Sequence, residues 1–309
     1  MPQRCESLGR KIFSSEHRLS RDTRQTNLRR RELGDFLRSR RLALDPKDVG
    51  LIPHAHRRHA GLGREQVAEL AGISADWYGR LEGGIETNPS HETLLALTRA
   101  LRLTTIEIRF VFELAGFAEP RSDEVPRELS ENVLDCLVVD PLRVGIYVMD
   151  VYLTPFKWNA IANALWRFSA AGTPIGRNFI YRLADPYVVS LLGSAYELTV
   201  RQLVGMFRRA HMCWPTPFSH HILEIALRVE VFRNFWNEHV VADPMWPASG
   251  PFPRWHPIVG ILWVNALSLS LAPARDEIVV ALTPADVASA RKMTRLRAIA
   301  KTSQTLTGR

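Results

Sequence analysis

The sequence predicts an α+β protein, in which an all-α domain of five short helices precedes a domain with a five-stranded antiparallel sheet and helices. Three observations predict this order. Residues 30–114 carry apolar side chains at helical spacing, with turn and cap signals between them. Residues 144–158 and 258–282 carry short β-rich runs, and the pattern between these segments is helical. A chain of 309 residues also suits two domains better than one.

Composition and linker signals set the expected domain boundaries. Residues 1–28 are polar and rich in Arg and Ser, and the stretch that begins EPRSDEVPRELS at residue 119 is polar and contains proline. The predicted organisation is a flexible arm at 1–28, a first domain at 29–118, a linker at 119–124, a second domain at 125–285 and a basic tail at 286–309.

The positive charge of the chain lies mainly in its N-terminal part. The net charge is +8, and residues 1–64 carry 16 Lys and Arg against 7 Asp and Glu, whereas residues 121–290 carry 14 against 16. The last 19 residues add six basic residues and no acidic one. This asymmetry favours a polyanionic partner for the first domain. An arginine-rich coding bias that merely inflates the count is the alternative.

Several classes of protein fit this sequence poorly. Three scattered cysteines favour neither a disulfide framework nor a zinc site, and His54, His56 and His59 lack the spacing of metal ligands. The N-terminus has no secretory apolar region, and the longest apolar stretch is too short to span a membrane. No hydrolase, nucleotide-binding or zinc-protease motif occurs. We therefore expect a cytoplasmic, non-catalytic protein without metal, cofactor or membrane partner.

Residues 63–88, GREQVAELAGISADWYGRLEGGIETN, predict two short helices joined by a tight turn. Gly72 suits the turn because glycine adopts positive φ at little cost, and Ser74 suits the N-cap of the second helix. Tyr78 and Leu81 are expected to point inward, three residues apart. The expected apolar face of the first helix comprises Val67, Ala68, Leu70 and Ala71. Helix pairs of this kind place their second helix in the major groove of DNA.

The outer face of this second helix is expected to carry Ala75, Asp76, Trp77, Gly79 and Arg80. Arg80 is the best candidate for a bidentate contact with guanine. Asp76 either accepts a hydrogen bond from cytosine or favourably occupies the helix N-terminus. Trp77 either packs on the sugar or a thymine methyl group, or is a partly buried hydrophobic residue, and Ser74 caps the helix, contacts phosphate, or does both.

Helical patterns flank this pair on both sides. Leu33, Phe36 and Leu37 predict a helix at 30–41, followed by a basic loop at 45–62. Ser90 is expected to cap a fourth helix, and Thr104 or Thr105 a fifth that ends at glycine. The runs LGDFLRSRR, GLGREQVAELAGISADWYGRLEGG and NPSHETLLALTRALRL, with LAG at 114–116, resemble the Xre-type helix-turn-helix family, and more narrowly its MmyB-like branch.

This resemblance implies a recognition helix at 74–81, and the positions that match the family's DNA-facing ones are Arg64, Ala75, Asp76, Trp77 and Arg80. Arg57 and Arg58 of the basic loop, together with Ser74 and Asn88, complete the set of residues expected to contact DNA. The sequence departs from the family at one point, because Glu82 is followed by Gly83-Gly84-Ile85 rather than by Gln-Gly-Arg. Contacts with the phosphates are therefore expected to depend more on the arginines at 57, 58 and 64.

The second half of the chain alternates strand and helix patterns. Helices are expected at 129–137, 159–168, 176–183, 187–192, 196–211 and 218–235, and strands at 144–149, 151–158, 258–264, 267–271 and 278–282. The segments KWNAIANAL at 157–165, FRNFWNEHVV at 232–241 and HPIVG at 256–260 are similar to the MmyB-like ligand-binding domain. That resemblance implies a PAS-like fold, a pocket between sheet and helices for an apolar molecule such as a fatty acid, and a homodimer.

The candidate ligand-binding residues are Phe156, Trp158, Asn159 and Trp263. Aromatic side chains line ligand cavities but also fill cores, and Asn159 either hydrogen-bonds a ligand or caps the helix that follows it. The expected function is a dimeric transcription regulator that binds double-stranded DNA and senses a small apolar ligand. The alternatives are a DNA-binding protein whose second domain is only a dimerisation scaffold, and a protein-interaction module or enzyme that uses the helix pair for docking.

Overall fold

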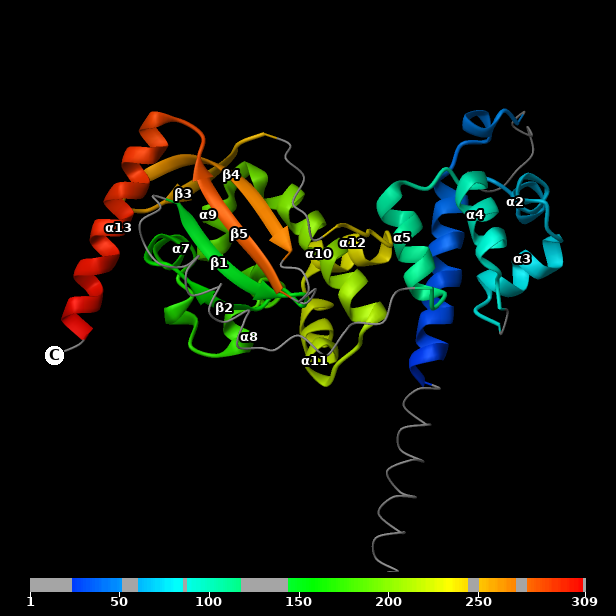
Figure 1. Ribbon diagram of the computed structural model, residues 1–309, viewed down its shortest axis with the longest axis horizontal. Coiled ribbons are helices and arrows are strands. Elements are labelled where there is room, and N and C mark those ends of the chain that lie inside the picture. Colours follow the sequence, from blue (N-terminus) through cyan, green and yellow to red (C-terminus); the bar gives the residue numbers. More distant parts are fainter. Residues whose placement is uncertain are drawn as a thin grey trace, which may run out of the picture. The chain divides into compact units, whose positions relative to one another are not determined.

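The computed structural model describes residues 24–51, 61–85, 88–117, 144–243, 250–270 and 277–307. The chain divides into two compact units, one built from the N-terminal helices and one from a sheet with its helices (Figure 1). None of the helices in the described ranges combines the length and the apolar composition needed to cross a bilayer. The predicted helix at 129–137, the linker at 119–124 and the beginning of the second domain at residue 125 lie outside the described residues.

The first unit contains the five predicted helices. They span residues 24–43, α2 Arg64–Ala71, α3 Ala75–Glu82, α4 His91–Ala100 and α5 Thr105–Leu114, with a short 3-10 helix, η1, at Pro46–Val49. Residues 24–28, which were assigned to the arm at 1–28, already belong to the first helix. The apolar stripe of Leu33, Phe36 and Leu37 marks only the middle of that helix, so its beginning was placed too late.

The side chains that were expected to form the core of this unit are buried. Phe36 and Phe110 are fully buried and pack edge to face, with ring centroids 5.2 Å apart. Ser90 and Thr104 cap α4 and α5 as predicted, and Thr104 forms a capping box with Glu107. Leu70 is the exception among the predicted apolar residues of α2, because its side chain is 41% exposed.

The second unit contains one five-stranded antiparallel sheet in the order β2-β1-β5-β4-β3 (Figure 1). The strands are β1 Gly145–Asp150, β2 Pro155–Trp158, β3 Phe252–His256, β4 Gly260–Ser270 and β5 Glu277–Pro284. The number and antiparallel arrangement of strands were predicted correctly, but two assignments were wrong. Residues 260–270 form one long strand rather than two, and β3 was missed. Pro253 weakened its strand signal, although proline is tolerated in an edge strand such as this one.

Helices occupy the segment between β2 and β3 as expected. They are α7 Ala160–Trp166, α8 Pro174–Arg177, α9 Pro186–Leu192, α10 Tyr196–Cys213, α11 Pro217–Ala226 and α12 Glu230–Asn237, with 3-10 turns η2 Ser169–Ala171, η3 Tyr181–Ala184 and η4 Gly193–Ala195. The predicted helices at 176–183 and 218–235 are each divided in two, the first at Asn178, whose side-chain oxygen accepts from the backbone N–H of Ile180.

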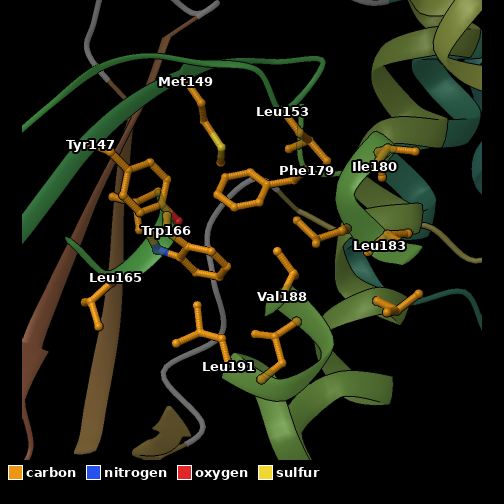
Figure 2. Packing of buried hydrophobic residues seen from close by; sticks show 14 of the residues in the cluster. Tyr147, Met149, Leu153, Leu165, Trp166, Phe179, Ile180, Leu183, Val188 and Leu191 are labelled. Atoms are coloured by element: carbon orange, nitrogen blue, oxygen red, sulfur yellow. The ribbon is translucent and has the colours of Figure 1, made fainter. Parts of the chain in front are cut away.

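One face of the sheet holds the core of the second unit. Inward residues of β1, β4 and β5 pack with α7, α9, α10 and α12 in one hydrophobic cluster, part of which is shown in Figure 2. On the other face of β4, alternate side chains stay partly exposed, among them Ile261, Trp263, Leu267 and Leu269 at 44–52%. The sheet thus has a second apolar surface besides the one that faces the core.

The segment predicted as a basic tail, 286–309, instead contributes a helix that completes the core. Helix α13, Val287–Thr307, contacts α7, β4 and β5, and Met293 and Leu296 are fully buried in the main cluster. The Asp286 side chain accepts from the backbone N–H of Ser289 and so caps the start of this helix. The six basic residues among the last 19 favoured a solvent-exposed tail. The two buried apolar positions, which lie about one helical turn apart, were therefore not predicted.

Leu296→Ala is expected to lower the free energy of unfolding of the second unit by about 2–5 kcal/mol, because it leaves a cavity in a packed core. Val287→Ala is the matched control on the same helix, since Val287 is 69% exposed, and we expect it to change stability by less than about 0.5 kcal/mol. Urea unfolding followed by tryptophan fluorescence measures both. Equal effects of the two substitutions would contradict the assignment of α13 to the core.

Candidate DNA-reading and ligand-binding sites

Helix α3 has a polar outer surface, and a glycine turn and an N-cap fix where the helix begins. Gly72 adopts φ 67° at the end of α2, and the Ser74 hydroxyl accepts from the backbone N–H of Trp77 at 3.2 Å, so that the turn and the N-cap are as predicted. Tyr78 and Leu81 point inward and are buried. Asp76 and Arg80 are exposed, and Ala75 and Trp77 are half-buried. The helix therefore offers two exposed charged side chains at adjacent turns.

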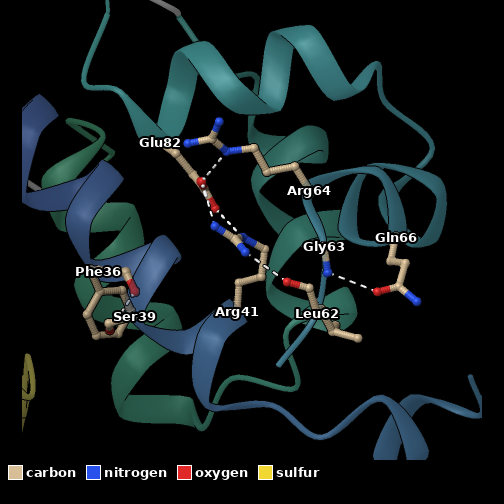
Figure 3. Close-up of polar contacts among 8 residues, drawn as sticks. All are labelled: Phe36, Ser39, Arg41, Leu62, Gly63, Arg64, Gln66 and Glu82. Atoms are coloured by element: carbon tan, nitrogen blue, oxygen red, sulfur yellow. Dashed lines mark hydrogen bonds and ion pairs between the residues drawn. The ribbon is translucent and has the colours of Figure 1, made fainter. Parts of the chain in front are cut away.

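The C-terminal end of α3 is fixed by a buried carboxylate that binds two arginines (Figure 3). The Glu82 side chain has no exposed surface; its Oε1 accepts from Arg41 Nε at 2.6 Å and its Oε2 from Arg64 Nε at 2.7 Å. Arg41 Nη2 donates a further hydrogen bond to Oε2 at 3.0 Å, and Nη1 donates to the Leu62 carbonyl at 2.8 Å. This network, here called the Glu82 cluster, joins the first helix, the start of α2 and the end of α3.

The charges of the Glu82 cluster stabilise one another. Burial alone would raise the pKa of Glu82, but hydrogen bonds from Arg41 and Arg64 outweigh burial and hold that pKa below its ordinary value. The same carboxylate raises the pKa of Arg41 although burial opposes this. A Cβ at Gly34 would lie 2.5 Å from the Glu82 carbonyl oxygen, so the first helix and the end of α3 approach so closely that only glycine fits.

Sequence reasoning missed the Glu82 cluster although a signal was present. Glu82 follows Tyr78 by four residues and Leu81 by one, so it lies on the inward face of α3, where a carboxylate requires a cationic partner. Arg64, which the family resemblance assigned to DNA, is one of these partners, but its side chain remains 48% exposed. Asn88 is exposed, and Arg57 and Arg58 lie outside the described residues.

The four residues predicted to bind a ligand do not converge on one site. The Asn159 side chain accepts from Ala162 and Ile146 backbone N–H groups at 3.0 and 3.1 Å and donates to the Val144 carbonyl at 2.8 Å, as a helix cap bound to β1. Trp158 packs on Phe168, with ring centroids 5.2 Å apart. Phe156 and Trp263 are 38% and 44% exposed. The cap alternative for Asn159 accounts for the bond from Ala162, and the bonds with Ile146 and Val144 tie the same side chain to β1 and the residue before it.

A small cavity lies instead between the sheet and the helices, and none of these four residues lines it. Its volume is about 20 Å³, and its lining comprises Tyr147, Met149, Trp166, Phe179, Thr199, Leu203, Arg254, Ala266, Val280 and Leu282. Figure 2 shows Tyr147, Met149, Trp166 and Phe179 directed toward one another at this place. Burial raises the pKa of the Tyr147 hydroxyl above its usual range, which keeps the hydroxyl protonated.

A second, open groove of the same unit has a volume of about 860 Å³. It is lined by residues of α8, η3 and α11 and by several charged side chains, including Arg167, Arg182, Asp185 and Arg228. Arg182 is buried and donates to the Trp166 carbonyl at 2.6 Å and pairs with Asp185 at 3.3 Å, so that part of this charge is already compensated. The groove is more polar than expected of a site for an apolar ligand.

Comparison with known families agrees with the two units. A model described as "Helix-turn-helix domain" matches residues 32–110, and one described as "MmyB-like transcription regulator ligand binding domain" matches residues 135–296, more than half of the chain. The comparison with curated proteins finds no match. A helix-turn-helix domain joined to a ligand-binding domain of this kind is the composition of a ligand-responsive transcription regulator. The chain belongs to the family of MmyB-like transcription regulators.

Proposed function

We propose that the protein is a sequence-specific regulator that reads double-stranded DNA with α3 and responds to a fatty acid or a similar apolar ligand in its second unit. The observation that carries the proposal is that α3 has one buried face and one exposed face. Tyr78, Leu81 and the Glu82 cluster hold the buried face against the rest of the unit, and Asp76 and Arg80 are exposed on the other face. A rigid helix with exposed donors and acceptors suits readout of base edges in the major groove.

Within the DNA-contacting set, Arg80 pairs with guanine, and the other residues contact phosphates or orient the protein on the DNA. Arg64 uses its half-exposed side chain for a phosphate while Glu82 orients the guanidinium. Arg57 and Arg58 add phosphate contacts, and Ala75, Trp77, Asn88 and the cap Ser74 shape the approach. DNA is the partner, so we place the protein in the cytoplasm. Affinity is expected to fall steeply with salt, as for any phosphate-binding surface.

The ligand site in this proposal is the cavity between sheet and helices rather than the region around Phe156 and Trp263. Its lining is mainly aromatic and aliphatic, with Thr199 and Arg254 as polar members, which suits a largely apolar ligand. The ligand changes DNA binding only if it favours one arrangement of the protein over another. The cavity has room for about one water molecule, so a longer ligand must move the lining side chains apart. The ligand would then bind the rearranged protein more tightly than the ligand-free arrangement.

A homodimer would present two α3 helices to successive major grooves about one helical turn apart. The exposed apolar residues on the outer face of β4, Ile261, Trp263, Leu267 and Leu269, also favour the second candidate function, in which the second unit serves only for dimerisation. The two candidates differ in whether a ligand alters the affinity for DNA.

Selection of bound sequences from random DNA tests the proposal. We expect a palindrome with half-sites about 10 base pairs apart, centre to centre. Titration of the selected site in the presence of fatty acids of different chain lengths then follows by fluorescence anisotropy. A change in affinity supports sensing, and an unchanged affinity with every acid supports the scaffold. A selection that enriches no sequence would contradict specific DNA binding.

A further inference from the structure

Arg254 is a buried cation in the core of the second unit. It lies on β3 between Phe252 and His256, and these three alternate positions face inward. Its residue surface is 2% exposed, and burial lowers the pKa of its guanidinium to about 10. Nη1 donates to the neighbouring Pro253 carbonyl at 2.8 Å, whereas Nε has no hydrogen-bond partner within the described part of the chain. No carboxylate among the described residues forms an ion pair with it.

Two more polar atoms without a partner line the same cavity as Arg254. They are Thr199 Oγ1 and Trp166 Nε1, both buried and without a hydrogen bond to any described residue. Buried polar groups in folded proteins are nearly always hydrogen-bonded, to protein, water or ligand. The remaining lining is apolar or aromatic and includes Met149, Phe179 and Leu203. A guanidinium, a hydroxyl and an indole N–H thus border one apolar space.

This combination defines the chemistry of the missing partner. A water molecule would satisfy a hydrogen bond but would leave the positive charge of Arg254 without a carboxylate among the described residues. Its guanidinium carbon would keep only the contact with the Phe252 ring, 5.7 Å from the ring centroid, and a buried charge without an ionic partner is costly. An anion compensates the charge, and the planar guanidinium matches a carboxylate in particular. The apolar lining disfavours a small hydrated ion and favours an anion that carries a hydrocarbon body.

We propose that Arg254 binds the acidic headgroup of an amphiphilic ligand, with Thr199 and Trp166 as further hydrogen-bonding groups and the hydrocarbon part among Met149, Phe179 and Leu203. The inference rests on the proposed ligand-sensing function and assigns its specificity to one charged residue. Methionine and leucine side chains near the cavity must repack to admit the chain, and methionine adapts readily to such changes. Ligand entry is therefore coupled to a change in the packing of β1 against α10, which carry Met149 and Leu203.

The test uses the full-length protein, stripped of bound lipid, and three probes: dodecanoate, 1-dodecanol and acetate. Isothermal titration calorimetry of the wild type is expected to give a Kd for dodecanoate at least about tenfold lower than for dodecanol, because only the acid pairs with the guanidinium. Acetate is expected to bind much more weakly, since it lacks the apolar body. Dodecanol binding as tight as dodecanoate, or no binding of dodecanoate, would overturn the proposal.

Arg254→Met keeps the approximate length of the side chain and removes its charge. We expect this variant to bind dodecanoate and dodecanol alike, with the preference of at least about tenfold lost, and Arg254→Lys to keep part of that preference. Arg228→Met, in the open groove, is the matched control and should behave as the wild type. If Arg228→Met instead abolishes the preference, the acid binds in the groove and the assignment to Arg254 fails.

The melting temperature of the ligand-free protein provides a second readout. We expect Arg254→Met to melt at the same temperature as the wild type or higher, because it removes a buried charge that has no ion-pair partner among the described residues. A fall of several degrees together with an unchanged acid preference would show that Arg254 serves structure alone. Both measurements are made without DNA, so a negative result overturns the headgroup assignment and leaves the random-sequence selection to decide the DNA-binding function separately.

Discussion

Arg80→Ala is expected to weaken binding to the selected DNA site by about 10- to 100-fold, the loss that follows removal of one bidentate contact with guanine. Arg80 is exposed on α3, does not belong to the Glu82 cluster and is not part of the core, so the fold should be unaffected. Binding to unrelated DNA should change much less than binding to the selected site, because base contacts rather than phosphate contacts are lost. Fluorescence anisotropy with both DNAs measures the difference.

Arg99→Ala provides the control for this prediction. Arg99 is also an exposed arginine, but it lies on α4, outside the proposed DNA-contacting set. We expect it to lower affinity only slightly and equally for both DNAs, as the loss of one remote positive charge would. A similar loss of specific binding in the two variants would show that Arg80 contributes charge and not recognition.

Glu82→Ala is expected to destabilise the first unit by about 3–5 kcal/mol, because it leaves the buried Arg41 without its carboxylate. Three helices meet at Glu82, through Arg41, Arg64 and the close approach of Gly34. Thermal or urea unfolding followed by circular dichroism measures the effect on this unit. Glu92→Ala, at an exposed position of α4, is the control and should change stability by less than about 0.5 kcal/mol.

The same carboxylate gives a pH signature with a definite sign. Since the pKa of Glu82 is lowered in the folded state, its stabilising effect is fully present above the pKa of an unfolded glutamate. The effect is lost as the pH falls below the pKa of an unfolded glutamate and through the lower folded pKa. The stability difference between the wild type and Glu82→Gln should therefore shrink on acidification. A difference that is constant from neutral to strongly acidic pH would contradict the ion-pair account.

Features of this protein that depend on neighbouring residues could be predicted from the sequence. The turn at Gly72 and the caps Ser74, Ser90 and Thr104 each need only a backbone group within a few positions. The inward direction of Tyr78 and Leu81 follows from the helical period alone. The five helices of the first unit and most strands of the second therefore follow from local signals.

The missed features depend on residues distant in the chain. Arg41 and Glu82 are separated by 41 positions, and nothing in either segment identifies the other as a partner. Arg254 lies in a strand whose signal was weakened by Pro253, so its alternation with Phe252 and His256 was not recognised. The buried Met293 and Leu296 lie among basic residues that suggested a solvated tail. In each case, charged residues or a proline in the local sequence favoured an exposed or irregular segment at a position that the tertiary structure buries.

The central claim is that the outer surface of α3 reads base edges, and a change of specificity tests it most directly. Random-sequence selection is repeated with Arg80→Gln, because arginine pairs with guanine and glutamine with adenine. We expect the consensus to change from guanine to adenine at one position of each half-site, with the other positions and the spacing retained. A consensus identical to that of the wild type would contradict the account, because Arg80 would then contact no base.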